Sequence, residues 1–124
     1  MIVAPPPLRP PVIHEAAFPF SCPRKPATTQ AMEACALKRI VAADHRIDAQ
    51  VAAAFELIAD RRDRRAFVAG ERAWIVYRHG SCEAEASRYH GGSAEGIAYL
   101  ACVENRNRAH LADLAVLLRE LRFH

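Results

Sequence analysis

The chain is poor in aromatic residues and has no proline after Pro26, and both deficits limit its architecture. Aromatic residues occupy 7% of the 124 positions, and many of the hydrophobic residues, 52% in all, are alanines. Because alanine buries little surface, we expect a thin core in a single small domain. Covalent links would help such a core, since a disulfide typically adds about 2–4 kcal/mol of stability.

The sequence patterns of several functional classes are also missing. No run of residues approaches the ~18–20 uninterrupted apolar positions of a membrane-spanning helix. There is no His-Glu-x-x-His zinc pattern, no Gly-x-Ser-x-Gly nucleophile elbow and no phosphate-binding loop. The chain has 17 Lys and Arg residues against 14 Asp and Glu residues, and this mixed balance alone does not show the clustered cations of a nucleic-acid interface. We therefore expect a protein that is not an enzyme, with no catalytic residue, metal site, cofactor, nucleic-acid partner or membrane span.

All eight prolines lie within residues 1–27, which divides the chain into two parts. Proline fixes φ and removes a backbone donor, so this stretch predicts an extended arm, in part polyproline II. Phe18 and Phe20 are candidates to dock the arm on the body. Residues 28–124 are free of proline and rich in Ala, Leu, Glu and Arg, which favours a helical domain.

Within this domain, apolar residues recur at helical spacing in three segments. Thr28 or Thr29 would cap the first helix, the run of charges at residues 60–65 would form the turn after it, and Gly91-Gly92 would end the second helix. Ser93 would cap the third helix. There is no Asn-Gly or Asp-Gly hairpin turn. The prediction is an all-α fold, a small antiparallel three-helix bundle with an extended Pro-rich arm, held by disulfides.

The four cysteines do not form a Cys-x-x-Cys pair. In an up-down-up bundle they gather at one end, which favours two disulfides and an exported protein. Three connectivities exist; we favour Cys22–Cys35, between the arm and the first helix, and Cys82–Cys102, across the Gly-Gly turn. Two alternatives remain open: a zinc site with His79 or His90 in place of a thiolate, and four free thiols in a cytosolic protein.

Three sequence blocks resemble the LprI-like lysozyme-inhibitor family. They are ATTQAMEACA at residues 27–36, ERAWIVYR at residues 71–78 followed by Cys82, and YHGGS at residues 89–93 followed by Cys102. The similarity runs from about Cys22 to Leu121. The family often has Gln, Thr and Arg at the positions of Glu71, Asn107 and His110, respectively.

The resemblance implies an exported helical protein of the bacterial envelope, periplasmic or secreted, whose relatives include inhibitors that bind lysozyme. Residues 1–7 lack the basic and apolar regions of a signal peptide, so the leader would be absent from this chain. The alternative functions are a structural or envelope-stress protein that binds a different partner and, less favoured, a small zinc-binding protein. The oligomeric state is not predicted.

The candidate partner-binding residues are Arg88, Tyr89, His90, Gly91 and Gly92. Glycines let the backbone approach a partner closely, and aromatic and cationic side chains are frequent in binding hot spots. A lysozyme cleft contains an essential acid and a carboxylate, which Arg88, Tyr89 or His90 could engage. The alternative is that the two glycines only turn the chain.

Three further residues of the central block form a structural signature. Trp74 and Tyr77 are expected to pack in the core, since aromatic residues at helical spacing usually fill the interior. Arg78 is expected to pair with Glu85 or Glu71. Asp44 falls near the apolar stripe of the first helix and would be a buried carboxylate that needs a partner.

Overall fold

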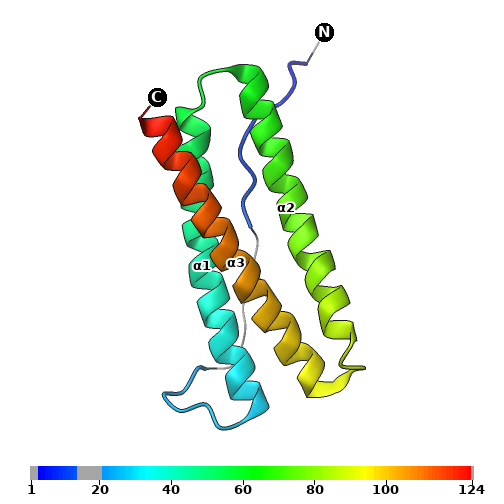
Figure 1. Ribbon diagram of the computed structural model, residues 1–124. Helices are drawn as coiled ribbons and strands as arrows, with labels where there is room; N and C mark the ends of the chain where they lie inside the picture. Colours follow the sequence, from blue (N-terminus) through cyan, green and yellow to red (C-terminus); the bar gives the residue numbers. More distant parts are fainter. Residues whose placement is uncertain (1–2, 14–20, 124) are drawn as a thin grey trace.

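The structure, a computed structural model that describes residues 3–13 and 21–123, consists of three long helices. These are α1 (Thr29–Leu57), α2 (Arg61–Ser87) and α3 (Gly92–Arg122), and the described residues contain no strand. Successive helices run in opposite directions (Figure 1). The prediction of an all-α fold with three helices is confirmed.

The helix boundaries agree with the capping expected at one end and differ at two others. The Thr28 side chain accepts a hydrogen bond from the Ala31 N–H at 3.0 Å, as predicted for an N-cap. The turn predicted over residues 60–65 is wrong, because Asp60 caps α2 and the arginines that follow are good helix formers. The predicted cap by Ser93 is also wrong, since α3 begins at Gly92 and Gly91 occupies its N-cap position.

The helices pack unequally around two apolar clusters. α3 packs closely on α1 and to a lesser extent on α2, whereas α1 and α2 touch each other little. One cluster contains Ile47, Val51 and Leu114, with half-buried Phe67 and Trp74 against it. The other contains Ile40, Cys82, Cys102 and Val103. The second cluster lies beside the α2–α3 connection, so that end of the bundle is held both by apolar packing and by the Cys82–Cys102 disulfide.

The N-terminal arm completes the first cluster. Residues 3–13 have no regular helix or strand and run lengthwise between α1 and α2 (Figure 1). Ile13 is only 8% exposed and packs against Ile47, Val51 and Leu114. Its N–H donates to Asp48 Oδ1 at 3.0 Å. The arm thus supplies apolar contacts between two helices that meet each other little; the docking predicted for Phe18 and Phe20 lies outside the described residues.

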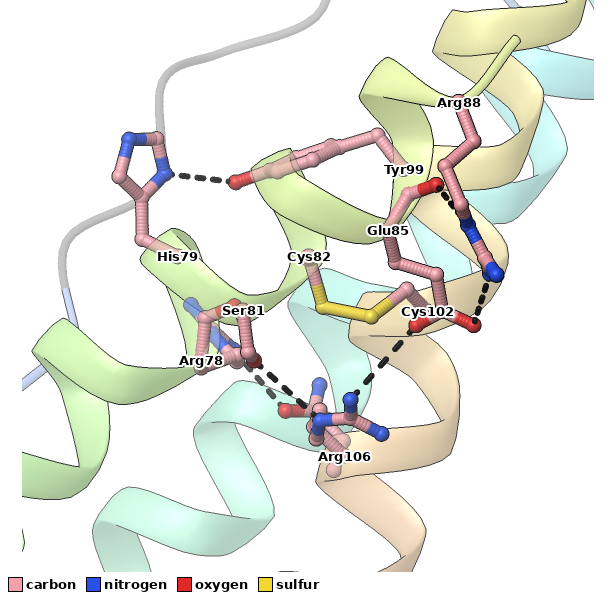
Figure 2. The surroundings of a disulfide bond; sticks show 10 residues. Arg78, His79, Ser81, Cys82, Glu85, Arg88, Tyr99, Cys102 and Arg106 are labelled. Atoms are coloured by element: carbon pink, nitrogen blue, oxygen red, sulfur yellow. Dashed lines mark hydrogen bonds and ion pairs between the residues drawn. A yellow bond between two sulfur atoms is a disulfide. The ribbon is translucent and has the colours of Figure 1, made fainter.

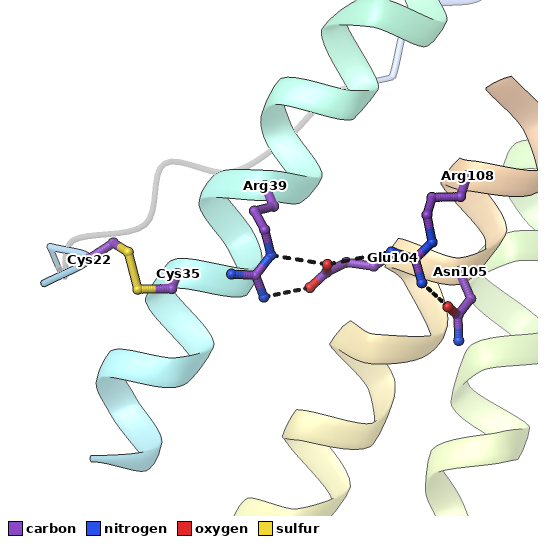
Figure 3. A network of polar contacts seen from close by, with 6 residues as sticks. All are labelled: Cys22, Cys35, Arg39, Glu104, Asn105 and Arg108. Atoms are coloured by element: carbon purple, nitrogen blue, oxygen red, sulfur yellow. Dashed lines mark hydrogen bonds and ion pairs between the residues drawn. A yellow bond between two sulfur atoms is a disulfide. The ribbon is translucent and has the colours of Figure 1, made fainter. Parts of the chain in front are cut away.

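The Cys22–Cys35 disulfide and an ion pair hold the start of α1. Cys22 and Cys35 are bonded to each other, which links the last part of the arm to α1 (Figure 3). One turn further on, Arg39 Nε and Nη2 donate to the two Glu104 carboxylate oxygens on α3 at 3.1 and 3.0 Å. The hydrogen bonds to Glu104 raise the pKa of Arg39 above its usual value. Arg39 is largely exposed, so the pair orients α3 on α1 more than it stabilises the fold.

No helix among residues 3–13 and 21–123 is long and apolar enough to cross a bilayer.

Candidate protein-binding site

The five predicted partner-binding residues lie together in the turn from α2 to α3. α2 ends at Ser87 and α3 begins at Gly92, so Arg88, Tyr89, His90 and Gly91 form the connection. All are exposed to solvent, including 54% of Tyr89, a large apolar ring. Exposed aromatic residues on a projecting turn are suited to partner contact. Their contact with a partner stays a prediction.

The backbone of this turn has an unusual conformation. Three consecutive residues have positive φ angles: His90 at 56°, Gly91 at 89° and Gly92 at 79°. Gly91 combines its φ of 89° with a ψ of 178°, a region that is essentially restricted to glycine. His90 adopts the left-handed region, which is uncommon for a residue with a side chain. The turn therefore depends on its glycines for backbone conformation.

Replacing Gly91 with alanine should lower the free energy of unfolding by about 1–3 kcal/mol, the typical strain of such a backbone. The cause would be conformational, because a Cβ at this position meets its nearest atom, a Glu95 oxygen, only at 3.8 Å. Gly70, inside α2, is the matched control: an added Cβ has nothing within 4 Å, and its backbone is helical. Gly70→Ala should raise stability by about 0.4–1 kcal/mol. Urea denaturation of both variants checks the opposite signs; equal effects would contradict the role given to Gly91.

A disulfide joins the two helices that carry the turn. Cys82 in α2 is bonded to Cys102 in α3, across a sequence separation of 20 residues (Figure 2). Both residues are almost fully buried, at 0% and 3% exposure. The disulfide pairs favoured from the sequence, Cys22–Cys35 and Cys82–Cys102, are thus the pairs present in the structure. The second one fixes the helix ends from which the exposed turn projects.

Ion pairs lie on the protein surface near this buried disulfide. Glu85 forms ion pairs with Arg106 at 3.6 Å and with Arg88 at 4.0 Å (Figure 2). Arg106 Nε also donates a hydrogen bond to Ser81 Oγ. The Arg88 side chain remains 73% exposed, so its pair with Glu85 contributes little. The Arg88 guanidinium can therefore turn to another carboxylate at small cost.

Beside the turn, α2 and α3 enclose an open pocket of about 570 Å³. His79 and Tyr99 line it and are hydrogen-bonded to each other, with His79 Nδ1 2.8 Å from the Tyr99 hydroxyl (Figure 2). Glu83 and Glu95 also line the pocket. A partner that contacts the turn would meet donors and acceptors here as well as the cation of Arg88.

Three polar side chains, one from each helix, meet inside the bundle. Arg78 Nη1 donates to Asp44 Oδ1 at 2.7 Å and to Asn107 Oδ1 at 2.9 Å, and Asn107 Nδ2 donates to Asp44 Oδ1 at 2.9 Å. All three residues are buried, which confirms the prediction for Asp44. The partners predicted for Arg78, Glu85 or Glu71, are wrong, because the carboxylate that satisfies it lies on α1.

Next to this cluster, a second polar pair links α2 to α3. His110 Nε2 lies 2.7 Å from Glu71 Oε2, and the His110 ring stacks on Trp74 with centroids 3.8 Å apart. The Arg78 guanidinium also lies over the Trp74 ring, 5.5 Å from its centroid. Glu71, Trp74 and Arg78 therefore lie along the face of α2 that meets α3. Glu71 and His110, two of the positions where the chain departs from the resembling family, contact each other.

The predicted core positions of the two signature aromatic residues are only half right. Trp74 is half-buried against the first cluster. Tyr77 is 54% exposed and lies under the Arg106 guanidinium, 5.7 Å from its ring centroid. The ring is therefore covered in part by a side chain of α3 and is not packed in the core.

The zinc alternative requires thiolates that the structure does not offer. All four cysteine sulfurs are engaged in disulfides, so none can ligate zinc beside His79 or His90. In the described part of the chain, no three His, Cys, Asp or Glu residues are placed to hold a metal ion.

Comparison with known protein families adds the decisive observation. The family model described as Lysozyme inhibitor LprI matches residues 22–114, which include both disulfides, the buried polar cluster and the α2–α3 turn. The chain belongs to the LprI lysozyme-inhibitor family. The LprI match begins at Cys22, the residue that anchors the arm, and so leaves the proline-rich residues before it outside. No curated protein and no solved structure matches the chain significantly.

Proposed function

We propose that this LprI-family protein is exported and inhibits a lysozyme by binding it, with no catalytic step of its own. Membership of a family described as lysozyme inhibitors carries the proposal. Export is supported by the two disulfides, because such bonds persist in the periplasm and outside the cell.

We further propose that the turn at residues 88–92 enters the catalytic cleft. Glycoside hydrolases use a pair of carboxyl groups about the scissile bond, and an exposed guanidinium such as that of Arg88 complements a carboxylate. Tyr89 would provide apolar contact beside it. The buried Cys82–Cys102 bond restrains both helix ends, so less conformational freedom is lost on binding.

A lysis assay tests this function. The purified chain is titrated against lysozymes of several classes acting on bacterial cell walls, and we expect inhibition of at least one class. Tyr89→Ala should weaken inhibition about tenfold or more, the loss typical of a hot-spot aromatic residue. His45→Ala, on the exposed side of α1, is the control and should leave inhibition unchanged.

Two results would overturn parts of the proposal. Absence of inhibition of every lysozyme class at micromolar excess would remove the lysozyme function and favour a different envelope partner. Inhibition that persists undiminished in Tyr89→Ala and in Arg88→Ala would retain the function but exclude the turn as the inhibitory segment.

A further inference from the structure

The end of the bundle opposite the α2–α3 turn collects arginines from three parts of the chain. The arm, the α1–α2 connection and the end of α3 meet there (Figure 1). We call it the arginine-rich end; its cations are Arg9, Arg61, Arg62, Arg64, Arg65, Arg119 and Arg122. Its acidic residues are Glu56, Asp60, Asp63 and Glu120. Seven cations against four acids account for the entire net charge of +3, so the rest of the chain is balanced.

Most of these arginines are not used by the fold. Arg64 is the exception: its Nε donates to the Ile58 carbonyl at 2.6 Å and its guanidinium covers the Phe55 ring. The other six are exposed, and none forms an ion pair or side-chain hydrogen bond with any residue that the structure describes. Of the acids at this end, Asp60 is engaged in capping α2. The positive charge of this end is therefore available to an anionic partner.

Apolar side chains are exposed at the same end. Phe123, directly after α3, is 82% exposed, and Leu57 at the last position of α1 and Leu8 in the arm are exposed as well. Leu8 also borders an open cleft of about 730 Å³ whose other walls include Pro5, Arg61 and Arg65. Large apolar groups amid unpaired cations are the pattern of surfaces that insert shallowly between lipid headgroups.

We propose that the arginine-rich end docks on the surface of an anionic lipid bilayer. Peripheral attachment needs both charge attraction and apolar insertion, and this end offers both. A soluble polyanion would engage the arginines but would gain nothing from burying Phe123 and Leu57. The 27 residues of α2 span about 40 Å, so a chain docked in this way presents the turn at residues 88–92 well away from the lipid. This inference does not depend on the identity of the partner bound by that turn.

Co-sedimentation of the full chain with lipid vesicles tests the proposal. We expect binding to phosphatidylglycerol-containing vesicles, little binding to pure phosphatidylcholine, and loss of binding in ~1 M salt, where the Debye length is about 3 Å. The triple variant Arg61→Gln, Arg62→Gln, Arg65→Gln should bind about a hundredfold more weakly, since each arginine near such a surface contributes about a fivefold factor. Phe123→Ser should weaken binding severalfold without changing the charge.

The matched control removes the same charge from the other end of the bundle: Arg24→Gln, Lys25→Gln, Lys38→Gln, all exposed residues. It should retain most of the binding, and circular dichroism should show both triple variants folded. Equal loss in the two triple variants would overturn the assignment of this end. Absence of binding to the anionic vesicles, or binding that Phe123→Ser leaves unchanged while free polyphosphate competes fully, would overturn the lipid surface as the partner.

Discussion

Arg78→Met should lower the free energy of unfolding by about 3–5 kcal/mol, measured by urea denaturation followed by circular dichroism. The guanidinium lies 2.7 Å from the buried Asp44 carboxylate and is the only cation among residues 3–13 and 21–123 that bonds to it; it also donates to Asn107 at 2.9 Å. Methionine preserves much of the side-chain volume, so the loss reports on the uncompensated charge and amide rather than on a cavity. Because domains of this size have a total free energy of unfolding of about 5–15 kcal/mol, this change alone should remove a large part of the stability of the fold.

A double-mutant cycle separates the ion pair from simple loss of packing. Asp44→Leu should also be strongly destabilising, since it removes the carboxylate that lies 2.7 Å from the buried Arg78 guanidinium. The double variant should be less destabilised than the sum of the two single variants, because both members of the pair are then removed together. Arg72→Met, an exposed arginine on the same helix, is the control and should change stability by no more than about 0.5 kcal/mol. Additive effects of the two single variants would contradict an energetic coupling between Arg78 and Asp44.

This buried cluster also shows how far the sequence could predict the structure. Asp44 was recognisable because it interrupts the apolar stripe of α1, and a buried carboxylate requires a partner. The partner was not recognisable, because Arg78 and Asn107 follow 34 and 63 residues later, on other helices. Local spacing favoured Glu71 or Glu85 for Arg78. Only the packing of three helices around one point reveals the correct carboxylate.

The same limit explains the error at Tyr77 and the success with the cysteines. Helical periodicity identifies the residues that share a face, but it does not say whether a neighbouring helix covers that face. α2 meets mainly α3, so Trp74 is half-buried while Tyr77 remains largely exposed. The cysteine pairs depend only on helix order and short connections, which proline and glycine positions indicate. The exposed turn at residues 88–92 was predictable for the same reason, whereas its run of positive φ angles, which begins at His90, was not.

Removing the Cys82–Cys102 disulfide with Cys82→Ala and Cys102→Ala should lower the free energy of unfolding by about 3–5 kcal/mol. The bond closes a loop of about 20 residues, for which restriction of the unfolded chain is worth ~3 kcal/mol. The two sulfurs also belong to a buried cluster with Ile40 and Val103, so their loss leaves a small cavity. Urea denaturation gives the stability, and hydrogen exchange of the amides at residues 88–93 should become faster as the helix ends separate.

The other disulfide provides the matched control for this prediction. Cys22→Ala with Cys35→Ala also removes two sulfurs and one closed loop, of 13 residues. Cys22, however, is only half-buried and lies in a segment without regular structure, so its release frees that segment while the three helices remain packed. We expect a loss of less than about 2 kcal/mol and unchanged exchange at residues 88–93. If the two double variants proved equally unstable and equally protected in the turn, the Cys82–Cys102 bond would have no special role in holding the proposed binding segment.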